Sequence, residues 1–431
     1  MKFTLCLSLL LTGLLQVHCH HVPGHHEEQE HNGDQNPLDH QHHPLEEGQG
    51  TEMTSYKKIV KTNAEFAFRL YKIITSDPAP KNVFFSPLSI STAFAMLTLG
   101  AKAETHHQIF NGLGFNLSDI EENVIHGGFK QIIHTINQPS NVTQLNIGNA
   151  LFIEKSLKVL PTFLNNLKTL YAAEGFSTNF KNSTSAENEI NNYVKNKTNG
   201  KISQAVEELD ESTVMIVLNY ITFKGVWEEP FKPTSTRNQD FFVDANTTVK
   251  VNMMHRKGDY SYLYDEDLSC SVVRVPYNGD YSAWFILPDE GKLTDVEHTL
   301  TGEVMTKWGK SVRHGKIELH IPKFSISGSY DVKDLLQTQG VNDVFHDNAD
   351  LSGITGQRDL RVSKAVHKAV MEVNEEGTEA AAVTTLEFVL KSGRIPRFPT
   401  FRYDRPFLIV INDDPTHNIL FVAKVYNPAA K

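Results

Sequence analysis

A run of small side chains near the C-terminus is the most informative segment of this chain. Residues 375–385 read EEGTEAAAVTT and lead into LEFVLKS at 386–392. Strand side chains alternate between two faces, so one face of this segment would carry only small, uncharged groups: Thr378, Ala380, Ala382 and Thr384. The other face begins with Glu379 and can meet solvent. Behind the hinge residues Glu375 and Gly377, such a segment is able to enter a packed sheet as a new strand.

Histidine is the other residue type here that could do chemistry. Eight histidines and eight carboxylates, with no Lys or Arg, lie between His20 and Met53. Residues 26–31 read HEEQEH, in which the second histidine falls one position late for the zinc-protease motif. A metal site needs fixed geometry, which a flexible tail lacks, so we expect no dedicated metal or other cofactor.

Catalytic motifs are missing from the sequence. There is no Gly-x-Ser-x-Gly elbow, no phosphate-binding Walker loop and no dinucleotide fingerprint. His367 has no evident nucleophile as a partner, and a satisfied core histidine is one interpretation of it. We therefore expect no catalytic residues and no enzyme.

The N-terminus has the pattern of a secretory signal. Lys2 supplies the positive end, residues 3–15 form the apolar core, and residues 17–19 give a cleavage site, so the signal spans residues 1–19. The apolar stretch is too short for a membrane span. Five glycosylation sequons agree with secretion into the extracellular space: Asn116, Asn141, Asn182, Asn196 and Asn246.

Residues 20–53 are polar and acidic, which predicts a disordered tail. They account for most of the net charge of −10, so the remaining chain is nearly neutral and offers no broad basic surface for nucleic acid. Beyond the signal the one cysteine is Cys270, so no internal disulfide is available and a large core must stabilise the fold.

The remaining residues, 54–431, read as one α+β domain. Apolar positions from Ile59 to Ile74 have helical spacing, and residues 86–97 predict a second helix that is apolar on all sides and hence buried. The β-branched run at 213–221 suits a strand covered on both faces. Shorter strands are expected later in the chain: 284–287, 316–320, 407–411 and 419–423.

The chain resembles the serpins over essentially this whole domain, and most closely their α1-antitrypsin-like plasma branch. The matching segments occur in order along the chain: NVFFSPLSIS at 82–91, LGAK at 99–102, NYITFKGVW at 219–227, LPD at 287–289, IPKF at 321–324, ADLSG at 349–353, VHKA at 366–369 and FRYDRPFL at 401–408. The resemblance implies three β-sheets, eight or nine helices and an exposed reactive-centre loop. It also implies a monomeric suicide inhibitor: a serine protease attacks the loop, and the acylated loop inserts into the central sheet before deacylation.

Counting along the loop as in the family places the scissile bond at Lys391-Ser392. A lysine before the bond suits trypsin-like proteases, whose specificity pocket holds a carboxylate. The loop is longer than the family pattern beyond this bond, so Arg394 and Arg397 remain rival sites, although Pro396 stiffens the region of Arg397.

Other positions carry over singly from the resemblance. Five residues match the shutter that opens below the central sheet: Phe84, Ser86, Ser89, Asn191 and His367. Glu375 and Lys323 match a salt bridge at the top of that sheet. A cluster at Lys307, Lys310, Arg313, His314 and Lys316 lies in a segment through which some relatives bind heparin, although it is thinner here. Its first three residues recur every third position and could share a helical face. A solvated charged face is the alternative interpretation.

A non-inhibitory serpin is the alternative function. Hormone carriers and storage proteins of the family usually place charged, bulky or proline residues in the hinge, whereas this chain keeps small ones. The sequence therefore favours inhibition, and a carrier function could coexist with it.

Overall fold

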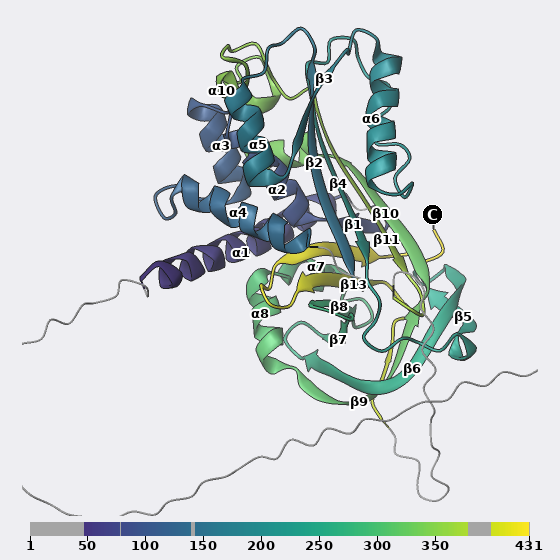
Figure 1. Cartoon of the computed structure of the whole chain (residues 1–431). Helices are drawn as coiled ribbons and strands as arrows, with labels where there is room; N and C mark the ends of the chain where they lie inside the picture. The colour runs from purple at the N-terminus through teal and green to yellow at the C-terminus, as the bar shows by residue number, and fades with distance from the viewer. Residues whose placement is uncertain (1–46, 78, 139–142, 378–397, 431) are drawn as a thin grey trace, which may run out of the picture. The chain divides into compact units, whose positions relative to one another are not determined.

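The computed structural model describes residues 47–77, 79–138, 143–377 and 398–430 (Figure 1). The signal, most of the tail and the loop residues 378–397 lie outside these ranges. The α-helices are α1 (Glu47–Ile74), α2 (Pro87–Thr98), α3 (Ala103–Leu113), α4 (Glu122–Ile136), α5 (Pro161–Tyr171), α6 (Ser183–Lys197), α7 (Leu293–Thr299), α8 (Gly302–Ser311), α9 (Val332–Gln337) and α10 (Ser352–Thr355). Short 3₁₀ turns lie at Pro233–Ser235 and Asp343–Phe345.

Five strands form the sheet that matters most for function. They are β2 (Gln144–Glu154), β3 (Glu174–Thr178), β4 (Met215–Lys224), β10 (Phe324–Asp331) and β11 (Lys364–Val373), in the order β10-β11-β4-β2-β3. Strand β4 is the buried strand that the β-branched run predicts, and it lies at the centre of the sheet.

The second sheet has nine strands. They are β1 (Val83–Phe85), β5 (Arg237–Phe242), β6 (Thr248–Asp265), β7 (Cys270–Pro276), β8 (Tyr281–Pro288), β9 (Arg313–Pro322), β12 (Thr400–Arg402), β13 (Phe407–Asp413) and β14 (Ile419–Val425). Their order is β1-β14-β13-β8-β7-β6-β9-β12, with β5 paired to β6. The short strands expected in the last third of the chain are all present as β8, β9, β13 and β14.

The counts of sheets and helices differ from the expected three and eight or nine. The described residues form two hydrogen-bonded sheets and ten α-helices. The number of sheets is lower because β6, an 18-residue strand, pairs in turn with β5, β9 and β7 and so joins strands that would otherwise form separate sheets.

Helices cover both faces of the five-stranded sheet (Figure 1). On one face α6 packs through Ala186, Ile190 and Val194 against side chains of β2 and β4. On the other face α2 contacts β4 and β2, and every residue of α2 is buried. The expected all-apolar helix is thus confirmed as the packed centre of the fold. No helix in the described ranges is both long and apolar enough to cross a membrane.

The first helix starts earlier than composition predicts. Helix α1 begins at Glu47, so residues 47–53, which we assigned to the disordered tail, are helical here. Once the packed turns around Phe66 and Leu70 exist, each added upstream residue gains a backbone hydrogen bond without a new nucleation cost.

Candidate functional site

A parallel pair of strands runs through the middle of the five-stranded sheet. Strands β11 and β4 pair in parallel from Lys364–Ile216 to Val370–Thr222, while each of them pairs antiparallel with its outer neighbour, β10 or β2. The pairing then stops, although β11 continues to Val373 and β4 to Lys224. We call this junction the seam. It is already open at one end, and parallel pairing is slightly weaker per residue than antiparallel pairing.

The chain turns back on itself at the open end of the seam. Asn374 and Gly377 exchange backbone hydrogen bonds of 2.9 and 3.2 Å, which closes a tight turn directly after β11. Gly377 also bridges Val226, and the Trp227 amide donates to the Glu376 carbonyl at 2.9 Å. The turn therefore holds the start of the predicted loop against the end of β4.

Only glycine fits at position 377. Its φ is +118°, and a Cβ there would lie 2.2 Å from the Gly225 carbonyl oxygen and 2.6 Å from the Val226 Cα. Both atoms belong to the backbone and cannot swing away, so any side chain would force the turn off β4. The hinge glycine that the sequence singles out is thus a requirement of the native turn.

Glu375 is held in place by two partners on other elements. Its carboxylate lies 2.6 Å from Lys323 Nζ and accepts a 2.7 Å hydrogen bond from the Thr236 hydroxyl. Burial alone would raise the pKa of Glu375, but the bonds from Lys323 and Thr236 outweigh it and lower the pKa. The expected Glu375–Lys323 pair is present in the structure, and it fixes the turn to the strand junction before β10.

A buried polar cluster lies beneath the seam, and we call it the shutter cluster: Ser86, Ser89, Asn149, Asn219 and His367. The Ser86 amide donates to His367 Nε2 at 3.0 Å, so the proton of the neutral imidazole is on Nδ1. That Nδ1–H donates to Asn219 Oδ1 at 2.6 Å, and the Ser89 hydroxyl donates to the same oxygen. Asn219 Nδ2 in turn donates to Asn149 Oδ1 at 2.7 Å.

This network ties the N-terminus of α2 to both strands of the seam. Ser86 is also the N-cap of α2, accepting the Ser89 amide at 3.2 Å. Complete burial lowers the pKa of His367 to about 3, so the ring is neutral at physiological pH. Phe84 flanks the cluster, stacked on Phe421 at 5.1 Å between ring centroids.

One predicted shutter residue is elsewhere. Asn191 lies on α6, where its side chain binds the backbone of Ala205 and Val206 at 2.7 to 3.0 Å. The asparagine of the cluster is Asn219, which the sequence analysis missed. A signal was available, because Asn219 is a lone amide within the buried apolar strand β4. Such a group must find partners inside the core.

Comparison with known proteins identifies the family of this chain. The model of the family described as serpin (serine protease inhibitor) matches residues 61–428. The chain is a serpin. It is 48% identical to alpha-1-antiproteinase of Callosciurus caniceps, over 86% of this chain and 89% of that protein. It is 44% identical to human kallistatin over 98% of both chains.

Solved serpin structures agree. Human thyroxine-binding globulin in complex with thyroxine superposes with a TM-score of 0.83 at 41% identity, covering 87% of this chain and all of that one. The resemblance to the α1-antitrypsin-like branch and the serpin fold are both confirmed. The description of the family names protease inhibitors rather than enzymes, which fits the expectation that the chain is not an enzyme.

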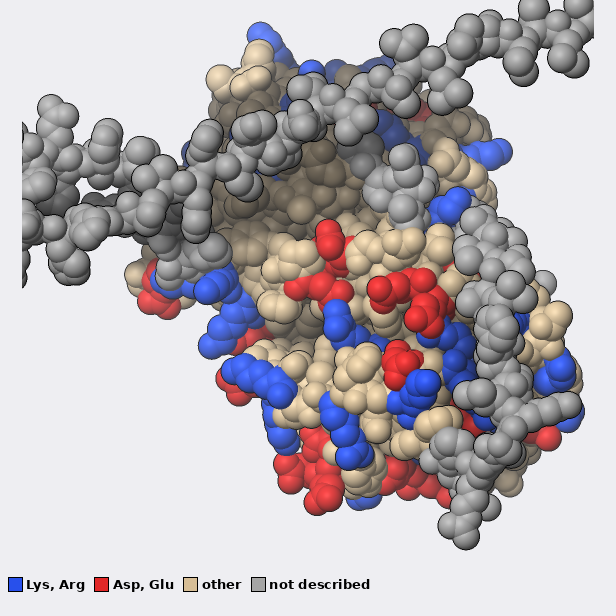
Figure 2. Space-filling model, turned by 60° about the horizontal axis from the view of Figure 1, so that its bottom comes forward, with Lys and Arg blue, Asp and Glu red and all other residues tan. Residues whose placement is uncertain are grey.

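The predicted heparin residues do not form one helical face. Helix α8 ends at Ser311, so Lys307 and Lys310 lie on the helix whereas Arg313 and Lys316 lie on β9. Lys307 is paired with Asp267 at 2.9 Å and with Asp265 at 3.5 Å. Figure 2 shows acidic side chains interspersed with the basic ones on the side of the serpin that it displays.

The remaining predicted positions fall into two groups. Thr378, Ala380, Ala382, Thr384, Lys391 and Ser392, with the rivals Arg394 and Arg397 and the sequon Asn141, lie outside the described residues. The other four sequon asparagines are exposed, as attachment of a glycan requires: Asn116, Asn182, Asn196 and Asn246.

Proposed function

We propose that this serpin is a secreted inhibitor of trypsin-like serine proteases and that its reactive bond is Lys391-Ser392. The observation that carries the proposal is the hinge turn at 374–377, seated at the open end of the parallel seam. The turn reverses the chain after β11, so a strand continuing from it would run antiparallel to both β11 and β4. The small-residue face of Thr378 to Thr384 suits such a strand.

Insertion would improve the hydrogen bonding of the sheet. A new strand between β11 and β4 replaces one parallel pairing by two antiparallel pairings, and the strand ends beyond Val370 and Thr222 gain a partner. This gain supplies a driving force that becomes available once the loop is cut and its two ends are free to separate.

The chemical step belongs to the target protease. Its serine hydroxyl attacks the Lys391 carbonyl carbon, the Lys391-Ser392 peptide bond breaks, and Ser392 leaves as a new amino terminus. Lys391 then remains joined to the protease as an ester. The ester persists if insertion of residues 378–391 outruns attack by water, and bulky side chains on the inward face would slow insertion.

A carrier function is the second candidate. Its support is the similarity to thyroxine-binding globulin, whose structure was solved with thyroxine. Titration of this serpin with thyroxine, followed by tryptophan fluorescence, tests it directly. Saturable quenching at one equivalent would establish a carrier site, and no quenching at micromolar ligand would remove this candidate.

Incubation with bovine trypsin tests the inhibitor proposal. The expected result is a covalent band near the summed mass on a denaturing gel, with a released peptide that begins at Ser392. A Lys391→Ala variant serves as the matched control and should form little complex. Cleavage without a complex would refute inhibition, and a peptide that begins at Ile395 would move the reactive bond to Arg394.

A further inference from the structure

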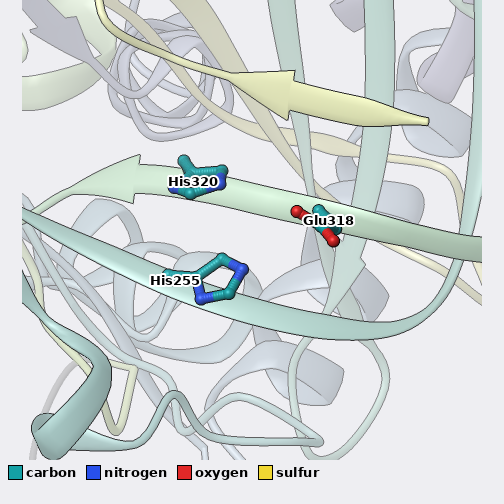
Figure 3. A group of neighbouring side chains, drawn as sticks. All are labelled: His255, Glu318 and His320. Atoms are coloured by element: carbon teal, nitrogen blue, oxygen red, sulfur yellow. The ribbon is translucent and has the colours of Figure 1, made fainter. Parts of the chain in front are cut away.

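Three side chains from two neighbouring strands, β6 and β9, converge next to strand β12. His255 on β6 pairs directly with His320 on β9, and Glu318 precedes His320 by two residues on the same face of the sheet. Figure 3 shows the two imidazole rings one above the other, with the Glu318 side chain beside them. The ring centroids are 4.4 Å apart.

Nitrogen atoms of both histidines are buried without a hydrogen-bond partner. These atoms are Nε2 of His255 and Nδ1 of His320, and the residue His320 is 8% exposed. Leaving a buried polar atom unpaired costs about 1–3 kcal/mol. His255 and His320 therefore differ from an ordinary core histidine such as His367, in which both ring nitrogens have a hydrogen-bond partner.

The spacing suits a metal ion. One ligand atom from each residue lies within 4.8 Å of the other two. Ligands of a tetrahedral Zn²⁺ lie about 3.3 Å apart, given metal–ligand bonds of about 2.0–2.1 Å. The three side chains share one face, so side-chain rotation is the movement needed to close the remaining gap between the ligand atoms.

A metal ion at this site would share the Glu318 carboxylate with Lys257. Lys257 pairs with Oε1 of Glu318 at 2.6 Å, and a carboxylate has a second oxygen to offer. Arg402 also lies nearby, and its guanidinium donates to Gln239.

We propose that His255, Glu318 and His320 form a binding site for a divalent transition metal ion, with Zn²⁺ the ion that best fits two imidazoles and one carboxylate. The fourth ligand position is open to water, since Glu318 and His255 are partly exposed.

The site lies where strand β12 attaches. Thr400 pairs with Glu318 and Arg402 with His320, and the Glu318 amide donates to the Pro399 carbonyl at 2.8 Å. Strand β12 follows directly after residues 378–397. A bound ion that fixes Glu318 and His320 therefore strengthens the anchor at the C-terminal side of the predicted loop.

Hydrogen exchange of the full-length protein, with and without Zn²⁺, tests the site. Some β9 and β12 amides can exchange only when the site opens. Zn²⁺ at ten times its dissociation constant should slow the exchange of these amides about tenfold. The histidine-rich N-terminal segment can also take up Zn²⁺, but binding there would not protect residues 313–322.

Two variants and one control make the test specific. Glu318→Gln keeps the shape of a partly exposed side chain and should lose the protection, as should His320→Asn. His314→Gln, an exposed histidine on the same strand, should keep it. No slowing in the parent, or equal slowing in all the variants, would overturn the proposal. The readout involves no protease, so it is independent of the proposed inhibitory function.

Discussion

The Nδ1–H of His367 donates to Oδ1 of Asn219 at 2.6 Å, directly across the seam between β11 and β4. Adjacent strands lie about 4.8 Å apart, so a strand inserted at the seam would separate these two residues by about 9.5 Å. The bond cannot survive insertion. It therefore contributes to the barrier that keeps the seam closed, and it makes the shutter cluster a natural target for mutation.

Replacing Asn219 should weaken this barrier. Asn219→Ala leaves three buried groups without their partner: the His367 Nδ1–H, the Ser89 hydroxyl and the Asn149 amide oxygen. Each unsatisfied group costs about 1–3 kcal/mol. We expect a lower thermal midpoint and faster loss of trypsin inhibition at 45 °C. Asn191→Ala, the same change on α6, should leave inhibition near the parent rate. Equal losses in both variants would argue against a special role for the seam.

The shutter cluster should also make stability depend on pH. An unfolded histidine has a pKa near 6.5, whereas that of folded His367 is about 3. Above pH 6.5 the ring is neutral in both states. Between pH 6.5 and 3 the unfolded state binds the extra proton, so the free energy of unfolding falls with falling pH, by up to about 1.4 kcal/mol per unit.

Unfolding rates measured from pH 7.5 to 4.5 test this slope. Rates can be measured even where unfolding is irreversible and no equilibrium constant is defined. His367→Gln should flatten the pH dependence relative to the parent, because the remaining titrating groups are common to both proteins. An unchanged slope in the variant would show that His367 is not the group responsible.

Side chains of the predicted loop should alternate between an inward and an outward face, and substitutions at two neighbouring positions test this alternation. Ala380→Arg places a long cation on the face that we propose enters the core, so insertion should slow and most encounters should end in hydrolysis. The number of inhibitor molecules consumed per trypsin molecule inhibited should rise several-fold. Glu379→Arg, one position away on the face predicted to meet solvent, should remain near the parent value. If the two variants behave alike, the loop does not insert in this register.

The Glu375–Lys323 pair should contribute modestly to stability. Lys323 is 37% exposed, so water screens the interaction. A double-mutant cycle with Glu375→Gln and Lys323→Met should give a coupling energy of about 1 kcal/mol in thermal unfolding, reduced by added salt. A coupling energy near zero would mean that the Thr236 bond alone holds the carboxylate.

Heparin binding should be weak and limited by local acids. Asp267 pairs with Lys307, and its negative charge offsets the positive charge that Lys307 could offer to heparin. Asp267→Asn should therefore raise the salt concentration that elutes the protein from a heparin column, and Lys310→Ala should lower it. Elution of all three proteins at one salt concentration would leave this cluster as an ordinary solvated face.

Local patterns in the sequence were enough to predict the class of the fold and several parts of the site. An all-apolar run after Ser86 predicts a buried helix, and a β-branched run predicts the covered strand β4, because both signals depend on neighbours a few residues away. The hinge glycine was predicted from its position before the run of small residues, and the Glu375–Lys323 pair followed from the family resemblance; the structure contains both.

Partners across the sheets were decided by the tertiary structure. Two asparagines could have completed the shutter, and only strand register places Asn219, rather than Asn191, opposite His367. Register likewise brings His255 beside His320 and Glu318, more than 60 positions later in the chain, and the end of α8 separates Arg313 from the helical lysines. Pairing between distant strands depends on how the whole core packs, and no local spacing in the sequence encodes it.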